Sequence, residues 1–477
     1  MALIGRIPRD LGNLTFLVSL VLRSNNFHGN LPQEIAHLRR LKYLDLSLNN
    51  FKGEVPSWFG FLHKLEVLNL GNNRFTGSIP CSFSNISTLE TLNLRFNSIE
   101  GEIPKAIGSL ENLRVLILGR NKFIGSIPEE IGNLHNLNVL SMEHNQLTGS
   151  IPFTIFNISS IQVIAFSNNS VSGKLPNDLC NRLPILKELH LSMNKLHGHM
   201  PISLSNCSQP QILSLSVNDF DGPIHSEIGR LSNLQILYLG SNHFTGEIPK
   251  EIRNLVELEE LALGFNSFSG SLPMEIFNIS GMRAMALSFN NLSGTIPPNI
   301  GSVLPNIEEL YMSNLTNLVG TVPHSISNCS KLTILELSGN KLTGLIPNSL
   351  GYLTHLQNLN LWENNLTSDS FLSFLTSLTN CRNLRLLDLS LNPLNGMLPV
   401  SVGNFSESLV KLYATDSKIN GQIPNELGNL SSLLDLDLSH NNLIGSIPTS
   451  THNLRNLQRM NNTCICSYRF PIPMDKV

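Results

Sequence analysis

Charged side chains are scarce in this 477-residue chain. Asp, Glu, Lys and Arg make up 14% of it and the formal net charge is −3, whereas an average soluble protein has about 25% charged residues. No stretch forms the basic stripe that nucleic-acid binding requires, and none forms an acidic tail. The sequence therefore excludes nucleic acid as a partner. Asn, Ser and Thr supply most of its polarity.

Long apolar runs are also missing. No run of about 18 apolar residues occurs, so we expect no transmembrane helix and no direct membrane insertion by this chain. The first residues, MALIGRIPRDLGNL, lack the basic and apolar regions of a signal peptide. We therefore expect the chain to be a truncated part of a longer parent protein.

Motifs that carry catalysis are absent. The sequence has no G-x-G, no G-x-x-x-x-G-K-[ST], no H-E-x-x-H, no G-x-S-x-G, and neither H-R-D nor D-F-G. A lone C-x-C, Cys464 and Cys466, is too little for a metal site. We therefore predict that the chain is not an enzyme and holds no cofactor and no metal.

Cysteine is sparse and odd in number. Seven residues cannot all pair within the chain. Cys207, Cys329 and Cys381 stand in N-C-S or N-C-R, where other repeats have N-L or N-I, so we expect buried thiols that act as small apolar residues. Cys81 and Cys180 also fit the repeat. This pattern predicts that disulfides do not hold the fold.

What the sequence does contain is a repeat. The segment 113–136, LRVLILGRNKFIGSIPEEIGNLHN, begins again 24 residues later as LNVLSMEHNQLTGSIP. Such a period, headed by L-x-x-L-x-L-x-x-N, is typical of a leucine-rich repeat solenoid. We predict an α/β solenoid: a right-handed superhelical horseshoe with a parallel β-sheet on its concave face and short 3-10 or extended segments on its convex side. Pro128 excludes a helix at its own position, and Gly125 is expected to have a positive φ.

The asparagine in the ninth repeat position should hydrogen-bond to backbone inside the turn, because this buried backbone needs partners. The sequence predicts Thr316 and Ser417 as substitutes in two repeats. The asparagines fall at Asn25, Asn49, Asn73, Asn97, Asn121, Asn145, Asn169, Asn194, Asn218, Asn242, Asn266, Asn290, Asn340, Asn364, Asn392 and Asn441.

These positions divide the chain into three parts. Residues 1–16 form a partial repeat, residues 17–448 form a solenoid of about 18 repeats of 24 residues, and residues 449–477 form a partial repeat and an irregular tail without a cap. The rhythm is irregular at 307–323 and at 364–391. In the latter segment Phe371, Leu372, Leu375 and Leu378 have helical spacing after Asp369, a candidate N-cap. We predict a short helix on the outer side, with a bend that positions a ligand as the alternative.

Acceptor sequences for N-glycosylation, N-x-[ST], recur along the chain, which suits a secretory route for the parent protein. Eight share one repeat position on the outer return: Asn13, Asn85, Asn157, Asn206, Asn278, Asn328, Asn404 and Asn429. Sugar there would leave the concave face open. The others are Asn168, Asn291, Asn314, Asn365 and Asn461.

Two groups of side chains on the concave face are candidate ligand contacts, because aromatic residues and arginine dominate binding hot spots. The first is Arg95, Phe96, Arg120, Glu143 and His144. The second is Tyr238, Phe265, Phe289 and Tyr311, with Trp362 two repeats further on. Because L-S-F-N recurs in this repeat type, the alternative is that Phe96, Phe265 and Phe289 are ordinary residues of the repeat with no role in binding.

The repeat at 433–448, LLDLDLSHNNLIGSIP, resembles those of plant leucine-rich repeat receptor-like kinase ectodomains. The segment 371–409, FLSFLTSLTNCRNLRLLDLSLNPLNGMLPVSVGNFSESL, is similar to the subfamily of bacterial pattern-recognition immune receptors. This resemblance implies a cell-surface receptor for defence signalling that binds a peptide or protein ligand, recruits a co-receptor kinase and signals through an intracellular Ser/Thr kinase. Signal peptide, cysteine-paired cap, membrane helix and kinase are all missing here, so only recognition carries over.

Other interpretations of the sequence remain open. The chain could be the front half of a mis-predicted receptor Ser/Thr kinase gene, and the genomic sequence downstream would show this. It could be an inhibitor-type or structural leucine-rich repeat protein, although those typically have caps and fewer repeats. It could also be a non-functional remnant, which would aggregate or stay in the cytoplasm.

Overall fold

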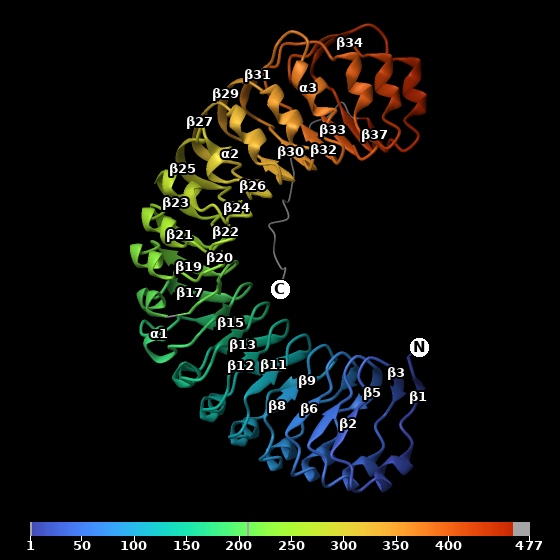
Figure 1. Ribbon diagram of the computed structural model, residues 1–477, viewed down its shortest axis with the longest axis vertical. Helices are drawn as coiled ribbons and strands as arrows, with labels where there is room; N and C mark the ends of the chain where they lie inside the picture. The colour runs from blue at the N-terminus through green and yellow to red at the C-terminus, as the bar shows by residue number, and fades with distance from the viewer. Residues whose placement is uncertain (1, 208, 461–477) are drawn as a thin grey trace. The chain divides into compact units, whose positions relative to one another are not determined.

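A computed structural model describes residues 2–207 and 209–460 (Figure 1). Cys464, Cys466 and the sequon at Asn461 lie outside these residues. The chain divides into two compact units, Met1–Phe268 and Ser269–Val477. Each unit is a stack of repeats in which short strands line one side and short helices the other (Figure 1).

The concave face of each unit is a parallel sheet of three-residue strands, one per repeat, paired in register with the strands of neighbouring repeats. In the first unit these strands are β2 (Ser19–Val21), β4 (Tyr43–Asp45), β6 (Val67–Asn69), β8 (Thr91–Asn93), β10 (Val115–Ile117), β12 (Val139–Ser141), β14 (Val163–Ala165), β16 (Glu188–His190), β18 (Ile212–Ser214), β20 (Ile236–Tyr238) and β22 (Glu260–Ala262). In the second they are β24 (Ala284–Ala286), β26 (Glu309–Tyr311), β28 (Ile334–Glu336), β30 (Asn358–Asn360), β32 (Leu386–Asp388), β33 (Lys411–Tyr413), β35 (Asp435–Asp437) and β37 (Arg459–Met460).

A second layer of parallel strands follows most of the turns, which the sequence did not predict; the turn at Asn392 is followed only by an isolated bridge at Met397. In the first unit it comprises β1 (Ile4–Gly5), β3 (Asn26–Gly29), β5 (Asn50–Glu54), β7 (Arg74–Thr76), β9 (Glu100–Glu102), β11 (Lys122–Ser126), β13 (Gln146–Ser150), β15 (Ser170–Gly173), β17 (Lys195–His199), β19 (Asp219–Gly222) and β21 (His243–Gly246). The division between the units falls in β23 (Ser267–Ser271). The second unit has β25 (Asn290–Thr295), β27 (Leu315–Gly320), β29 (Lys341–Leu345), β31 (Asn365–Thr367), β34 (Asn420–Gln422) and β36 (Asn442–Ile444).

Short helices on the convex side close each repeat, as predicted. Pro128 is extended, with φ −64° and ψ 136°, and the 3-10 helix η6 begins directly after it. The 3-10 helices of the first unit are η1 (Arg9–Asn13), η2 (Gln33–His37), η3 (Ser57–Phe61), η4 (Cys81–Asn85), η5 (Lys105–Ser109), η6 (Glu129–Asn133), η7 (Phe153–Asn157), η8 (Ile202–Asn206), η9 (Ser226–Arg230) and η10 (Lys250–Asn254). Those of the second are η11 (Met274–Asn278), η12 (His324–Asn328), η13 (Asn348–Tyr352), η14 (Val400–Asn404), η15 (Asn425–Asn429) and η16 (Thr449–Asn453).

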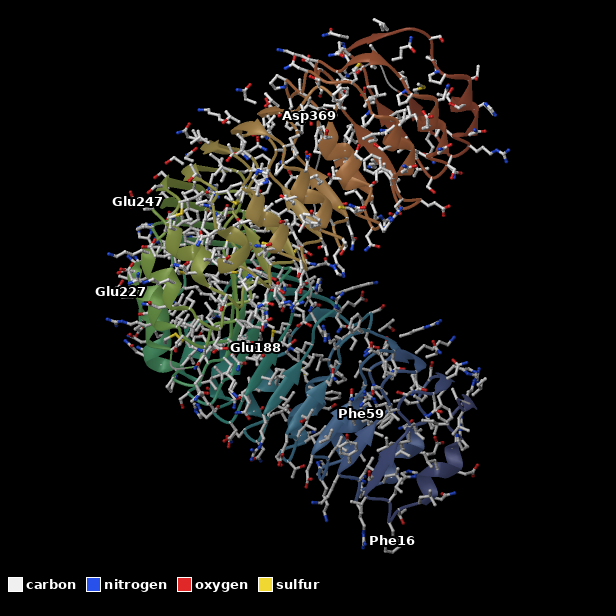
Figure 2. All side chains as sticks on the ribbon, turned by 45° about the horizontal axis from the view of Figure 1, so that its top comes forward. Phe16, Phe59, Glu188, Glu227, Glu247 and Asp369 are labelled. Carbon is white, nitrogen blue, oxygen red and sulfur yellow. A yellow bond between two sulfur atoms is a disulfide. The ribbon has the colours of Figure 1, made fainter. Side chains whose placement is uncertain are left out.

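Leucines fill the space between the layers, and Leu113, Leu116 and Leu118 are all fully buried. Phenylalanines add a second ladder: the Phe51 and Phe75 rings stack with centroids 6.4 Å apart. Phe59 is fully buried on η3 (Figure 2). Each repeat thus buries its apolar face against its neighbours, as a one-dimensional stack requires.

The asparagines in the ninth repeat position, called the ladder asparagines below, form the predicted hydrogen bonds within their turns. They also join neighbouring repeats. The Nδ2 of Asn121 donates to the carbonyls of Leu118 (3.0 Å) and Gly119 (3.3 Å) in its own turn and to that of Leu94 (3.0 Å) in the preceding repeat. Its Oδ1 accepts from the Ile99 N–H at 3.0 Å. Gly125 has φ 77°, as expected.

One predicted substitute for the ladder asparagine is wrong and the other is confirmed. Thr316 is exposed, and Leu315 occupies the buried position instead, because the extra residue of this repeat lies between Leu315 and Leu318. Ser417 is fully buried, and its hydroxyl donates to the carbonyls of Leu389 and Thr415, both at 3.1 Å.

In three of the repeats that are longer than 24 residues, an α-helix replaces the 3-10 helix. These helices are α1 (Leu179–Arg182), α2 (Ile300–Val303) and α3 (Ser373–Leu378). Helix α3 confirms the helix predicted in 364–391. Asp369, labelled in Figure 2, precedes it, and its carboxylate accepts the N–H of Ser373; the N···O distance is 2.9 Å. Phe371, however, is 66% exposed and precedes the helix, because Leu372 has a left-handed φ of 46°.

The cysteines require one correction. Cys207 is not a buried free thiol: it forms a disulfide with Cys180, whose Cα lies 4.9 Å from its own. Helix α1 presents Cys180 to the neighbouring η8, so the bond links two repeats on the convex side. Cys329 and Cys381 are buried free thiols, as predicted, and burial raises the pKa of each to about 11.

Candidate ligand-binding site

The loops that follow the inner strands present the candidate contact residues. The residue before each ladder asparagine has a left-handed backbone: φ is 54° at Phe96, 56° at Arg120 and 53° at His144. A left-handed residue with a side chain costs about 1–2 kcal/mol. Backbone hydrogen bonds to the next repeat offset this cost, since the N–H of Phe96 donates to the Gly119 carbonyl at 3.1 Å. The position of each side chain is therefore set by the repeat.

The first predicted group comes together in the first unit, after strands β8, β10 and β12. Both guanidinium groups lie over one ring: the Cζ of Arg95 is 5.0 Å and that of Arg120 is 4.7 Å from the centroid of Phe96. Cation–π contacts of this kind contribute about 0.5–1 kcal/mol at exposed sites. Phe96 remains 40% exposed, so the ring is held in place and still open to a ligand.

Glu143 ties this group across an intervening repeat. Its Oε1 lies 3.1 Å from the Nε of Arg95, and its other oxygen accepts a hydrogen bond from the Ser141 hydroxyl. Gly119 in the repeat between makes this possible, because a Cβ there would collide with the Glu143 carboxylate. Sequence reasoning missed Gly119, although serine is the commoner residue at its position.

Arg120 keeps a positive charge available. No carboxylate in residues 2–207 or 209–460 forms an ion pair with it, and its Nε is buried without a hydrogen bond to any of those residues. Beside it, the Nδ1 of His144 lies 2.6 Å from the Nδ2 of Asn168. The arrangement is an exposed aromatic ring flanked by one neutralised and one unneutralised arginine.

The members of the second predicted group are divided between the two units: Tyr238 and Phe265 belong to the first, and Phe289, Tyr311 and Trp362 belong to the second. The Tyr238 hydroxyl donates to Glu260. The Tyr311 hydroxyl donates to Glu309 at 3.1 Å, and burial raises its pKa. Phe265 is 37% exposed. Trp362 and Phe289 are half-buried.

Buried acids on the second unit's sheet were not predicted. Strand register places Tyr311, Glu336, Asn360, Asp388 and Tyr413 side by side on β26, β28, β30, β32 and β33. Burial raises the pKa of Glu336 to about 7 and that of Asp388 to about 6. Each carboxylate accepts a backbone N–H two residues on, from Ser338 (3.1 Å) and Ser390 (3.0 Å). An acid at the end of a strand, where most other repeats have a neutral residue and only Asp45 and Asp437 are further acids, was the available signal.

In the first unit, a histidine and a glutamate form a hydrogen-bonded pair on strand β16. The Nε2 of His190 lies 2.9 Å from a carboxylate oxygen of Glu188, and this hydrogen bond lowers the pKa of Glu188. His190 is buried and Glu188 half-buried; Figure 2 labels Glu188 on its strand.

Within the described part of the chain, no three His, Cys, Asp or Glu side chains are placed to hold a metal ion. None of its helices has the length and apolar character to cross a bilayer.

Comparisons with known proteins agree with this architecture. A leucine-rich repeat region model matches residues 4–123, and a Leucine Rich Repeat model matches residues 136–158, 186–207, 233–255, 331–353, 383–405 and 432–454. The ectodomain of the Arabidopsis receptor kinase HAESA, solved with the peptide hormone IDA and the co-receptor SERK1, superposes with a TM-score of 0.79. It is 33% identical, over 96% of this chain and 80% of that chain. The chain belongs to the leucine-rich repeat ectodomains of plant receptor kinases.

Two further relatives support the same family. The structure of PEPR1 with AtPEP1 has a TM-score of 0.80 and 31% identity, over 96% of this ectodomain and 70% of that chain. Among curated proteins, the LRR receptor-like serine/threonine-protein kinase EFR of Arabidopsis thaliana is 41% identical over 86 residues, which is 17% of this ectodomain and 8% of EFR. The receptor kinase-like protein Xa21 of Oryza sativa subsp. japonica is 42% identical over 90 residues, 18% of this ectodomain and 9% of Xa21. The ectodomain thus aligns with less than a tenth of either.

Proposed function

We propose that this ectodomain recognises an extended peptide or protein segment on its concave face, as part of a plant receptor kinase in defence signalling. The observation that carries the proposal is the group of Arg95, Phe96, Arg120 and Glu143. It offers an exposed ring held by two guanidinium groups, one of which has no carboxylate partner among the described residues. Aromatic and arginine anchors beside small residues are the usual hot spots of protein interfaces.

The chemistry of the group indicates what part of a ligand it suits. An unneutralised guanidinium binds carboxylates with two parallel hydrogen bonds, which a lysine cannot reproduce. The Phe96 ring suits an apolar ligand side chain beside that carboxylate. His144 extends the contact surface into the next repeat. Tyr238, Phe265, Phe289, Tyr311 and Trp362 are proposed as further contacts, each within its own unit.

Relatives support the class of ligand and partner. One related ectodomain was solved with a peptide, AtPEP1, and another with the peptide hormone IDA and the co-receptor SERK1. By this likeness the parent receptor binds a peptide or protein ligand, recruits a co-receptor kinase and stands at the cell surface with this part outside. Likeness to the receptor kinases EFR and Xa21 supports a receptor kinase as the parent protein; membership of the pattern-recognition subfamily is part of the proposal. Catalysis is proposed for a kinase domain of the parent, not for this ectodomain.

Selection from a random-sequence peptide display library on the secreted ectodomain tests the proposal, followed by calorimetry with the strongest synthetic binder. Arg120→Ala and Phe96→Ala should each weaken binding roughly 30-fold, the effect of a hot spot of about 2 kcal/mol. Phe61→Ala on the convex η3 is the matched control and should leave the affinity unchanged. Binding that survives both concave variants would overturn the assignment of this group.

The second group is tested in the same assay. Tyr238→Ala and Tyr311→Ala change one residue in each unit, so each reports on its own unit. A loss with either variant adds that unit to the binding surface. An unchanged affinity in both removes the second group from it.

A further inference from the structure

Sequons are not scattered evenly over the repeats. Eight of them place the acceptor asparagine on the last residue of a 3-10 helix: Asn13, Asn85, Asn157, Asn206, Asn278, Asn328, Asn404 and Asn429, which end η1, η4, η7, η8, η11, η12, η14 and η15. We call these positions the helix-end row. They are all on the convex side, and all eight are exposed.

The repeat itself keeps this row exposed. In every member of the row except Asn13, whose following Leu14 is 52% exposed, the residue after the asparagine turns into the core: Ile86, Ile158 and Cys329 are fully buried. Its N–H closes the 3-10 turn, as from Ile158 to the Ile155 carbonyl at 3.1 Å. Because the middle residue of the sequon is anchored inward, the asparagine before it must point to solvent. A large sugar attached there displaces no buried group, because the hydrogen bonds of the row's side chains, from Arg182 to Asn157 and from Asn206 to Asn181, are exposed.

Two other sequons lie on the concave face, in the left-handed position of the strand-end loops. Asn168 has φ 57° and Asn314 has φ 50°, and both are half-buried. The Nδ2 of Asn168, the atom that glycosylation modifies, lies 2.6 Å from His144 Nδ1. Asn314 lies over Gly339, where an added Cβ would collide with its Oδ1. A sugar at either site would have to push the side chain out of these contacts.

From this placement we infer that secreted copies of the ectodomain carry N-glycans along the helix-end row and none at Asn168 or Asn314. In the modification, Nδ2 of the asparagine forms a bond to C1 of the first sugar of a lipid-linked oligosaccharide diphosphate. The C1–O bond to the diphosphate breaks, the lipid diphosphate leaves, and the amide loses one proton. The sugar coat then shields the convex side and leaves the concave face bare.

Because the oligosaccharide is transferred to the chain before it folds, the packed loops do not block the transfer itself. They act afterwards, by hindering the folding of chains modified at Asn168 or Asn314. A chain modified at Asn168 loses the contact with His144 and places a bulky polar group on a packed loop. Such chains fold poorly and are depleted from the secreted pool. The remaining described sequons, Asn291 and Asn365, are exposed at the start of outer strands and fit a glycan.

Site occupancy on secreted protein tests the inference. The full chain is secreted from plant cells behind a foreign signal peptide and digested to peptides. Peptide-N-glycosidase A then removes the glycans from the glycopeptides in ¹⁸O-water. Modified asparagines then become ¹⁸O-labelled aspartates, which mass spectrometry locates. Label is expected at the helix-end row and at background level at Asn168 and Asn314. Label at those two sites equal to that of the row, or an unlabelled row, would overturn the inference.

Matched sequon variants give a second readout. Ser159→Ala removes the sequon of Asn157, and Ser170→Ala removes that of Asn168 while leaving the asparagine in place. Ser159→Ala should increase gel mobility by one glycan, and Ser170→Ala should leave mobility unchanged. A one-glycan shift with Ser170→Ala would contradict the inference. Neither readout involves ligand binding, so its failure is distinct from a failure of the proposed recognition.

Discussion

At the end of β12 and the following loop, the first unit carries Ser141 and Glu143, whereas at the end of β28 the second unit carries Glu336 and Ser338. The acid and the serine exchange positions between the two units, and the electrostatic surroundings of the two glutamates differ. Glu143 reaches an arginine two repeats away. Glu336 faces neutral and acidic neighbours, and burial raises its pKa to about 7.

Despite this difference, the turns of the two units share the same pattern of hydrogen bonds between asparagine and backbone. Asn121 in the first unit and Asn340 in the second each donate to two carbonyls of their own turn and one of the preceding repeat, and each accepts one backbone N–H. The comparison shows that leucines and asparagines fix the scaffold while the strand-end positions are free to vary. Recognition is therefore encoded in few positions per repeat.

The largest expected effect is on the shared leucine ladder. Leu116→Ala and Leu335→Ala should each lower the free energy of unfolding by about 2–5 kcal/mol, because each leaves a cavity in a fully packed core. Hydrogen exchange measured by mass spectrometry should show the loss in the mutated repeat and its neighbours. If one variant is silent, the two scaffolds are not equivalent. Lys122→Ala on the surface is the control.

The asparagine ladder should give the next largest effect. Asn121→Ala and Asn340→Ala each leave several backbone groups without partners, at about 3 kcal/mol. Chemical denaturation compares the two variants with wild type. Similar losses are expected in both units, and a loss confined to one unit would break the shared-scaffold account.

The pH dependence should separate the units. Glu336 and Asp388 have pKa values of about 7 and about 6 in the folded chain, because burial raises them above the ordinary values of 4.5 and 3.8. Between about pH 4 and pH 7 the folded state retains protons that the unfolded state releases. Raising the pH through this range should therefore destabilise the second unit, by about 3 kcal/mol for each of the two groups, since one pKa unit corresponds to about 1.4 kcal/mol.

Denaturation curves at several pH values, read by hydrogen exchange in each unit, provide the measurement. Glu336→Gln should flatten the dependence in the second unit. In the first unit the pKa values of Glu130, Asp178, Glu188 and Glu227 are lowered, so its stability should not fall over this range. A pH response that is unchanged by Glu336→Gln would contradict the role given to this group.

The smallest expected effect concerns Gly119. Gly119→Ala should force Glu143 away from Arg95, at about 1 kcal/mol, the order expected for a partly exposed ion pair. In a Glu143→Ala background the same change should cost little, because the collision is gone. A double-mutant cycle by denaturation gives the coupling. Equal costs in both backgrounds would show that Glu143 does not depend on Gly119.

Much of the fold was predictable because the repeat period reports the one-dimensional stack directly. Leu116, Asn121, Gly125 and Pro128 play their expected parts, and α3 lies where helical spacing placed it. The Cys180–Cys207 disulfide was missed because the two residues are 27 apart in sequence and meet only once α1 forms on the convex side.

The candidate site was predictable in its residues more than in its contacts. Arg95, Phe96 and Arg120 meet because the period aligns their loops. The role of Gly119 could not be predicted, since it depends on the length and direction of the Glu143 side chain. The Thr316 assignment failed because an inserted residue can enter on either side of the buried position, and only packing selects Leu315.

Hydroxyl-radical footprinting of the first unit, with and without a saturating library-selected peptide, tests the central claim most directly. Phe96 on the concave loop is 40% exposed and Phe61 at the end of η3 is 49% exposed, so the two rings form a matched pair. If the concave face holds the ligand, oxidation of Phe96 should fall several-fold and that of Phe61 should stay constant. Protection of Phe61 with no change at Phe96 would contradict the account.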